Sequence, residues 1–134
     1  MESKDASTAG ANVHIPGSLS ARELTSWVES SGEDDFVDFK GPMAWDGDHR
    51  AELAKDIVAF SNSRGGGALV IGRTELEDGQ FGFDGLTPGQ AASFDTTEVA
   101  RWVNARFEPP VRLRCQTVER RNKRFVLIFV REFE

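Results

Sequence analysis

The stretch Ala51–Gly72 constrains the fold more than any other part of this chain, because it joins a helical pattern to a strand pattern through glycines. Apolar residues in its first half recur at helical spacing, which predicts a helix with one buried face and with Asp48 as its N-cap. Gly65, the first of three consecutive glycines, is expected in the left-handed conformation that ends a helix. The unbroken apolar run at 68–71 then indicates a strand that is covered on both faces.

Two further patterns precede this stretch. A capping-box sequence at 20–23 predicts the start of a short helix. Alternation of apolar and charged residues at 36–40 predicts a strand whose apolar side chains face the core. On the other face of this strand we expect Asp38 and Lys40 to lie side by side, roughly 7 Å apart along the strand.

The second half of the chain predicts a loop, a helix and a hairpin. Residues 75–85 are rich in Gly, Asp and Phe, which indicates a loop or a hairpin excursion. A second capping-box pattern at 95–98 opens a helix that the prolines at 109–110 are expected to close. Strand alternation followed by an apolar run then predicts a hairpin over 111–130, with its turn at 119–123.

The order of these elements predicts a single α+β domain, in which a mixed β-sheet packs against two helices and an extra helix lies near the N-terminus. Residues 1–15 are small and polar and are expected to be a disordered leader, which leaves 16–134 for the domain. The single cysteine, Cys115, excludes an internal disulfide and is expected to pack in a strand. No apolar run reaches the ~20 residues of a membrane span, so we expect a cytoplasmic protein with no membrane partner.

Charge is distributed unevenly along the chain, whose formal net charge is −6. Residues 1–98 contain 7 Lys and Arg against 18 Asp and Glu, whereas residues 99–134 contain 9 against 4. This distribution allows a local basic surface that contacts phosphate on an otherwise acidic protein, and the alternative is an ordinary solvated face. The candidate nucleic-acid-binding residues are Arg64, Arg112, Arg114, Arg120, Arg121, Lys123 and Arg124.

Two acidic residues near the first strand are candidate metal ligands. Glu33 and Asp38 are five residues apart, so they can converge only if Glu33 lies in the bend before the strand. Such a carboxylate pair would hold Mg²⁺ or Mn²⁺, with Lys40 beside it to meet a phosphate. The alternative is a solvated acidic connection between helix and strand.

The glycine turn has its own functional alternative. Backbone N–H groups at Gly65–Gly67 could approach a phosphate, as in an ATP-binding regulatory module. These glycines follow a helix and precede a strand, which is the reverse of the order in phosphate-binding loops that open a helix. Chain reversal alone therefore explains them, and we favour that interpretation.

Taken together, these motifs resemble the Schlafen AlbA_2 domain family. The family pattern is an E-x4-E-F-K strand, a helix ending in A-F-x-N-[ST]-x-G-G, and a strand ending in I-G. The corresponding segments here are 33–40, 57–66 and 69–72, and the resemblance extends over about Ala21 to Arg131. Asp38 stands where the pattern has its second glutamate. The resemblance implies an Alba-like α+β fold and nucleic-acid binding, and the partner that we expect is RNA, including tRNA, ahead of DNA.

Ribonuclease members of this family cut RNA at a metal-dependent site made of two motif acids and an aspartate just after the I-G strand. The resemblance places the first two acids at Glu33 and Asp38, and the family lysine at Lys40. Glu75 is the nearest acid after that strand and is the candidate for the third position. The resemblance raises two alternatives, a nucleic-acid-binding module and a Mg²⁺- or Mn²⁺-dependent endoribonuclease, and the glycine turn adds a third, an ATP-binding module. It also suggests a homodimer, because nuclease members hold RNA between two such modules.

Overall fold

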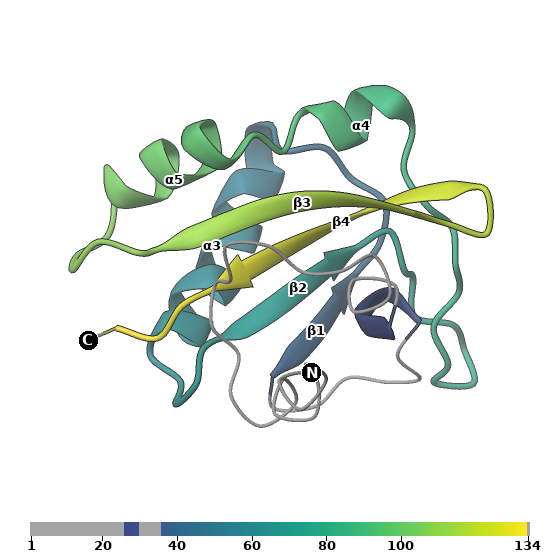
Figure 1. Cartoon of the computed structure of the whole chain (residues 1–134), viewed down its shortest axis with the longest axis horizontal. Helices are drawn as coiled ribbons and strands as arrows, with labels where there is room; N and C mark the ends of the chain where they lie inside the picture. Colours follow the sequence, from purple (N-terminus) through teal and green to yellow (C-terminus); the bar gives the residue numbers. More distant parts are fainter. Residues whose placement is uncertain (1–25, 30–35, 134) are drawn as a thin grey trace, which may run out of the picture.

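The computed structural model describes residues 26–29 and 36–133 (Figure 1). The expected leader, the capping sequence at 20–23 and Glu33 lie outside the described residues. Residues 26–28 are helical, in agreement with the short helix expected there. The described residues form an α+β arrangement with a mixed sheet, which confirms the predicted fold class.

The sheet contains four strands in the order β1-β2-β4-β3. Strand β1 pairs in parallel with β2, whereas β4 pairs antiparallel with both β2 and β3. The strands are β1 (Val37–Lys40), β2 (Gly67–Ile71), β3 (Leu113–Arg120) and β4 (Lys123–Val130). This order places β1 at one edge of the sheet and β3 at the other, so the two edges carry different sets of charged side chains.

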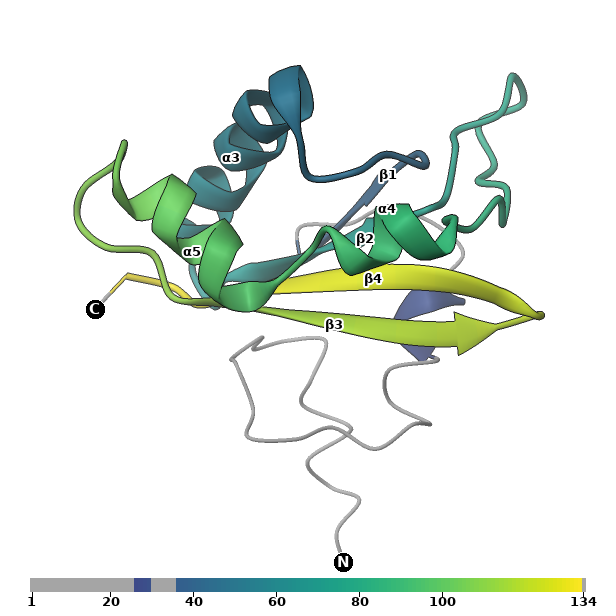
Figure 2. The same ribbon diagram turned by 90° about the horizontal axis from the view of Figure 1, so that it is seen from above.

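The helices between β1 and β3 cover one face of the sheet, and residues 26–29 lie on the opposite face (Figure 2). The helices are α3 (Gly47–Ser61), which connects β1 to β2, α4 (Pro88–Ala92) and α5 (Thr96–Asn104). The sequence patterns do not predict α4, a single-turn element that begins with a capping box between Thr87 and Gln90. None of the described helices is long and apolar enough to cross a lipid bilayer.

The apolar side chains form a separate core on each face of the sheet. The core on the helix face includes Leu53 and Ile57 from α3, together with Val99 and Val103 from α5. The core on the opposite face is built from Val28, Val37, Phe39, Ala68, Val70, Val118, Phe125, Leu127 and Phe129. Every residue of β2 is buried, as its unbroken apolar sequence predicts.

The ends of α3 differ from the predicted ones. Its N-cap is Asp46 rather than Asp48, which lies inside the first turn, and the Asp46 side chain makes no capping hydrogen bond. Its C-cap is Asn62, so Gly65 does not end the helix. Gly65 instead has a φ of 84° in the turn that leads into β2, because the chain needs further residues to reverse direction after the helix.

The second half of the chain also differs from the prediction at its boundaries. Helix α5 begins with Asp95 as its N-cap, as predicted, but it ends at Asn104, well before the prolines. The Asn104 side chain bonds both backbone groups of Val111 and so closes the connection to β3. The hairpin turn is shorter than the predicted 119–123, because the strands continue to a two-residue turn at Arg121 and Asn122.

Cys115 packs against the core on the helix face, as predicted for a cysteine in a strand. Burial raises the pKa of its thiol to about 12. The thiol is therefore protonated near neutral pH and is unsuited to act as a nucleophile.

Candidate functional sites

The first charged site lies where the edge strand β1 meets α3. Lys40 Nζ lies 2.7 Å from Asp56 Oδ2 and 3.6 Å from Asp38 Oδ2. The predicted neighbours Asp38 and Lys40 do share a face of β1, because alternate residues of a strand point the same way. Asp56 was not predicted as part of this site, since on the sequence it is an ordinary polar residue of a helix.

Burial by itself would lower the pKa of Lys40. The hydrogen bond and charge of Asp56, with the smaller effects of Asp38 and Glu52, outweigh burial and raise the pKa above its ordinary value. Lys40 is therefore charged at neutral pH and its ammonium is held between two carboxylates of its own chain. A phosphate would have to compete with both of them for this lysine.

A buried cation occupies the position just after the I-G strand. Arg73 is only 3% exposed, and its guanidinium lies 3.8 Å from the centre of the Phe83 ring and 4.6 Å from that of Phe39. The guanidinium donates hydrogen bonds to the backbone carbonyl oxygens of Val28, Phe81 and Gly82. Burial lowers the pKa of Arg73 from its ordinary value, but an arginine still remains charged. Arg73 thus ties the excursion at 74–85 and the N-terminal segment to the sheet.

Contacts within the chain account for the glycine turn. The backbone N–H of Gly65 donates to the Glu132 carboxylate over 2.8 Å. A Cβ at Gly66 would collide with the Val130 carbonyl oxygen, and a Cβ at Gly67 would collide with the ring of Phe60. Close packing and chain reversal therefore require these glycines, which supports the interpretation favoured from the sequence. ATP binding at this turn stays a prediction, and it would require a phosphate to displace Glu132.

The hairpin cations divide between the two faces of the sheet. Arg114 pairs in register with Phe129, a member of the core opposite the helices, so Arg114 lies on that face. Arg112 lies just before β3, where its backbone carbonyl oxygen accepts a hydrogen bond from the Arg131 N–H over 2.9 Å. Arg120 and its register partner Lys123 continue the face of Arg114 toward the tip of the hairpin. Arg124 points to the helix face, because its neighbour Phe125 belongs to the other core.

The two arginines at the tip of the hairpin share a carboxylate. Arg120 Nε lies 2.8 Å from Glu29 Oε2, and Arg121 Nη2 lies 2.9 Å from Glu29 Oε1. The hydrogen bond from Arg121 is the largest of the effects that lower the pKa of Glu29. Glu29 was not predicted from the sequence, because it lies about ninety residues away from both arginines. Two cations therefore share one anion at this tip.

An aromatic ring supports the same tip. The Arg121 guanidinium lies 3.9 Å from the centre of the Phe83 ring, whose centre is also close to Arg73. Lys123 Nζ donates to the Phe83 carbonyl oxygen over 2.8 Å. The excursion at 74–85 therefore holds the hairpin tip, a contact that the predicted loop or hairpin excursion did not include.

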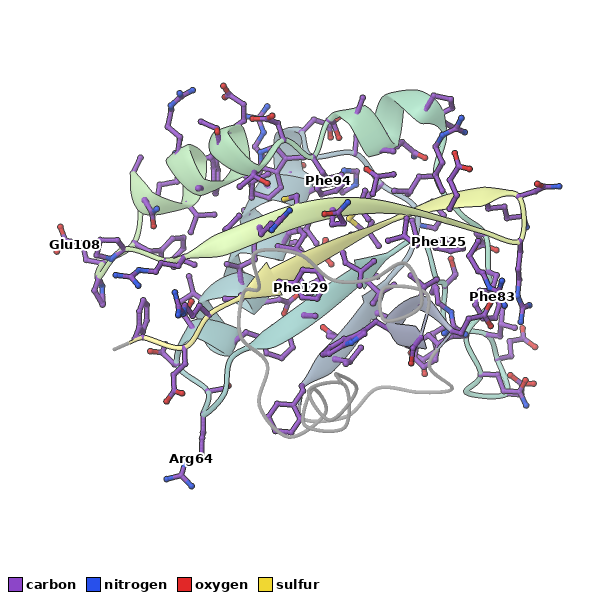
Figure 3. The ribbon with its side chains drawn as sticks, viewed as in Figure 1. Arg64, Phe83, Phe94, Glu108, Phe125 and Phe129 are labelled. Carbon is purple, nitrogen blue, oxygen red and sulfur yellow. The ribbon has the colours of Figure 1, made fainter. Side chains whose placement is uncertain are left out.

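Arg64 does not join the other candidate cations. It is exposed on the glycine turn and points away from the protein, at the opposite end of the sheet from the hairpin tip (Figure 3). Arg114, Arg120 and Lys123 thus share the face opposite the helices, whereas Arg121 lies in the hairpin turn. Arg124 lies on the helix face, and Arg64 lies away from the hairpin. A single phosphate cannot contact them all.

A family comparison identifies the domain. The family model described as Schlafen, AlbA_2 matches residues 33–134. The chain belongs to the Schlafen AlbA_2 family. No curated protein sequence matches this chain significantly.

Two solved structures resemble this Schlafen AlbA_2 domain. One is the solution structure of the N-terminal domain of a protein from Nitrosomonas europaea, described as related to the ATP-dependent DNA helicase RecG. It is 20% identical, covers 87% of this chain and 76% of that one, and has a TM-score of 0.54. The crystal structure of the DIP2311 protein from Corynebacterium diphtheriae is also 20% identical, covers 72% of this chain and has a TM-score of 0.49. This chain spans 20% of the length of the Corynebacterium protein.

The acids expected at a Schlafen-type metal site are not gathered in the described part of the chain. Among residues 26–29 and 36–133, no three His, Cys, Asp or Glu side chains are grouped as metal ligands. Asp38 faces the ammonium of Lys40. Glu75 lies on the exposed excursion, where its backbone forms an isolated antiparallel β-bridge with Phe81. Arg73 is the residue that directly follows Gly72. Because Glu33 lies outside the described residues, metal binding by Glu33 and Asp38, with Glu75 as the third acid, stays a prediction.

Proposed function

We propose that this Schlafen AlbA_2 domain is a nucleic-acid-binding module that contacts the phosphate backbone with its β3–β4 hairpin. The observation that carries the proposal is the charge of this segment. Residues 112–124 contain six Lys and Arg but one acid, Glu119, in a chain whose net charge is −6. A local excess of this kind attracts a polyanion even when the whole protein is acidic.

The contacts of Glu29 support the same proposal. Its carboxylate accepts hydrogen bonds from the side chains of both Arg120 and Arg121. Phosphate oxygens accept guanidinium hydrogen bonds with similar geometry, so these two arginines are already arranged to bind an oxyanion. A phosphate that approached the tip would replace or join Glu29 there.

RNA is the first partner to test, because the family resemblance implies it. The proposal is for binding without cleavage. It rests on Lys40 being held by two carboxylates and on Arg73 occupying the position after the I-G strand. If Glu33 and Asp38 did hold a metal, Asp38→Asn would abolish Mn²⁺-dependent cleavage and leave metal-free binding nearly unchanged.

The experiment is a titration of labelled single-stranded RNA, tRNA and duplex DNA, with and without Mn²⁺, that measures both binding and strand cleavage. Duplex DNA is included because the Nitrosomonas protein is described as related to a DNA helicase. Arg112→Gln with Arg114→Gln should weaken binding to all sequences alike. The salt dependence on a single strand should fall by roughly 0.7 per lost phosphate contact.

Lys55→Gln is the matched control, because it removes one positive charge from an exposed position of α3, outside the hairpin. It should change the affinity and the salt dependence little. Absence of binding by the unaltered protein to every probe at low salt would overturn the proposal, and the hairpin cations would then be an ordinary solvated face.

We also propose that two copies of the chain pair to form a two-sided nucleic-acid groove. The proposal follows from the family resemblance, in which two modules hold one RNA, and from the frequency of two-fold dimers among assemblies. Light scattering should then give twice the monomer mass of 14.8 kDa. A monomer mass at high micromolar concentration, both with and without RNA, would contradict the proposal.

A further inference from the structure

A second candidate binding site lies between α3 and α5. It is a pocket of about 450 Å³, which is within the usual range of small-molecule sites. Both helices lie on the face of the sheet opposite residues 26–29 (Figure 2). The pocket is therefore separate from Arg114, Arg120 and Lys123, which lie on the opposite face of the sheet, and it was not predicted from the sequence.

Two tryptophans form the aromatic part of the pocket. Trp45 is buried, and its ring meets that of Trp102 edge to face, with centres 5.7 Å apart. The Trp45 backbone N–H donates to Ser93 Oγ over 2.8 Å, which fixes the loop before α3. Trp102 is only partly buried, so part of its indole remains available to a ligand. The rings offer a rigid apolar surface with low conformational entropy to lose on binding.

Three arginines supply the charge of the pocket. Arg50 comes from the start of α3, Arg101 from α5 and Arg106 from the turn after it. Arg106 lies 4.0 Å from the centre of the Trp102 ring and donates to the Trp102 carbonyl oxygen. One acid, Glu98, also lines the pocket and pairs with Arg101 over 2.7 Å. The lining therefore carries an excess of positive charge.

Arg50 has a shielded side-chain nitrogen that lacks a hydrogen-bonding partner within the described part of the chain, which distinguishes the pocket from an ordinary surface depression. Its Nε is shielded from water and has no hydrogen-bonding partner among the described residues. A shielded donor without an acceptor is unfavourable in a folded protein. Nε itself is closed to a water-sized atom, so an anion in the pocket would bind the remaining N–H groups of this guanidinium, with charge-assisted hydrogen bonds.

We propose that this pocket binds a nucleotide, with its phosphate at the Arg50 guanidinium and its base against Trp102. A nucleotide combines the two features that the lining offers to a ligand, a planar ring for an indole and an oxyanion for guanidinium groups. An inorganic anion would leave the tryptophan surface unused, and a neutral aromatic molecule would leave the Arg50 guanidinium without an anion. The ligand is either a free mononucleotide or the terminal nucleotide of a strand.

The first test is a titration of the full chain with AMP, adenosine and inorganic phosphate, followed by NMR of the indole N–H groups. The chain contains three tryptophans, of which Trp45 and Trp102 line the pocket and Trp27 packs on the opposite face of the sheet. AMP should shift the indole N–H signals of the two pocket tryptophans and leave the signal of Trp27 unchanged. Adenosine and phosphate should each bind at least about tenfold more weakly, because each makes only part of the contacts. Unchanged pocket signals at millimolar AMP would overturn the proposal.

The second test is a comparison of two variants of α3. Arg50→Gln should weaken AMP binding by about tenfold or more, whereas Lys55→Gln, which removes the same charge from an exposed position outside the pocket, should leave it within about twofold. Equal effects of the two variants would overturn the proposal, because they would indicate a general attraction of anions. If Arg50→Gln does not fold by thermal denaturation, Arg106→Gln replaces it with the same expectation.

A third comparison separates the two sources of the nucleotide. An RNA strand with a 5′-phosphate should bind more tightly than the same strand with a 5′-hydroxyl if the pocket accepts a strand end. Equal binding of the strands, together with AMP binding that depends on Arg50, would assign the pocket to a free nucleotide. The AMP titration does not involve Arg112 or Arg114. Its failure is therefore distinguishable from failure of the hairpin to bind nucleic acid.

Discussion

The two edges of the sheet differ in how their charges are balanced. Near the β1 edge, Lys40 lies between Asp38 and Asp56, and Arg73 is buried against backbone carbonyl oxygens. At the β3 edge, cations outnumber acids, and one carboxylate, from Glu29, is shared by two arginines. The charges near β1 are therefore used to hold the fold, whereas the hairpin has a local excess of positive charge, on which the proposed contact with phosphate rests. Similar residue types in one small domain thus differ in how many acids lie near them.

The largest expected effect is at Arg73. Replacing it by Met removes the cation and leaves backbone carbonyl oxygens without their donor, which should lower the free energy of unfolding by about 3 kcal/mol. Arg64→Met is the control, because Arg64 is exposed and should change stability by no more than about 0.5 kcal/mol. Urea denaturation measures both. Equal stabilities of the two variants would show that Arg73 is not a structural cation.

The next effect is at Lys40. Lys40→Met should cost about 1–2 kcal/mol of stability, because it leaves the shielded Oδ2 of Asp56 without its cation. A double-mutant cycle with Asp56→Asn should give a coupling energy of about 1 kcal/mol between the two side chains. A coupling energy near zero would mean that Lys40 is not held by Asp56, and the lysine would then be available to a phosphate.

A smaller effect, on binding rather than stability, is expected at Glu29. Glu29→Gln removes the carboxylate that Arg120 and Arg121 share, so nucleic-acid affinity should rise by about threefold to tenfold. The dependence of affinity on salt should become steeper, because two more cations can contact phosphate. Fluorescence anisotropy with labelled RNA measures both quantities. Glu119→Gln is the matched control on the same hairpin, and equal gains in the two variants would indicate only a change in total charge.

The smallest effect is the pH dependence of the same contact. The hydrogen bond from Arg121, with further effects of Arg120, outweighs burial and lowers the pKa of Glu29 below its ordinary 4.5. The stability that this contact supplies is therefore fully present above that pH and is lost as pH falls through the lowered pKa of the folded state. Thermal denaturation of both proteins between about pH 5 and about pH 3 measures this effect. The unaltered protein should lose more stability over this range than Glu29→Gln does, because the variant has no carboxylate to protonate at position 29. Identical pH profiles would contradict the assignment.

The sequence by itself determined the elements of this domain and their order. Strand alternation at β1, the apolar run of β2, the aspartate cap of α5 and the hairpin all follow from neighbouring residues, because periodicity and capping are local properties. The predicted ends of the elements were less accurate than their order, since α3 begins and ends away from the predicted caps. The short α4 was missed because a single turn has too few residues to show a period.

Tertiary structure alone decided which charges are balanced. Lys40 pairs with Asp56 of α3, Arg73 donates to the carbonyl oxygen of Val28, and Arg120 pairs with Glu29. Each of these partners comes from another element or from a distant part of the chain. No local pattern marks a helix aspartate or an N-terminal glutamate as the partner of a particular cation. The pocket between α3 and α5 arises in the same way, because Arg50 and Trp102 meet only when both helices pack on one face of the sheet. The periodicity of apolar side chains depends on residues that are close in sequence. The pairing of charges depends instead on which surfaces the folded chain brings together.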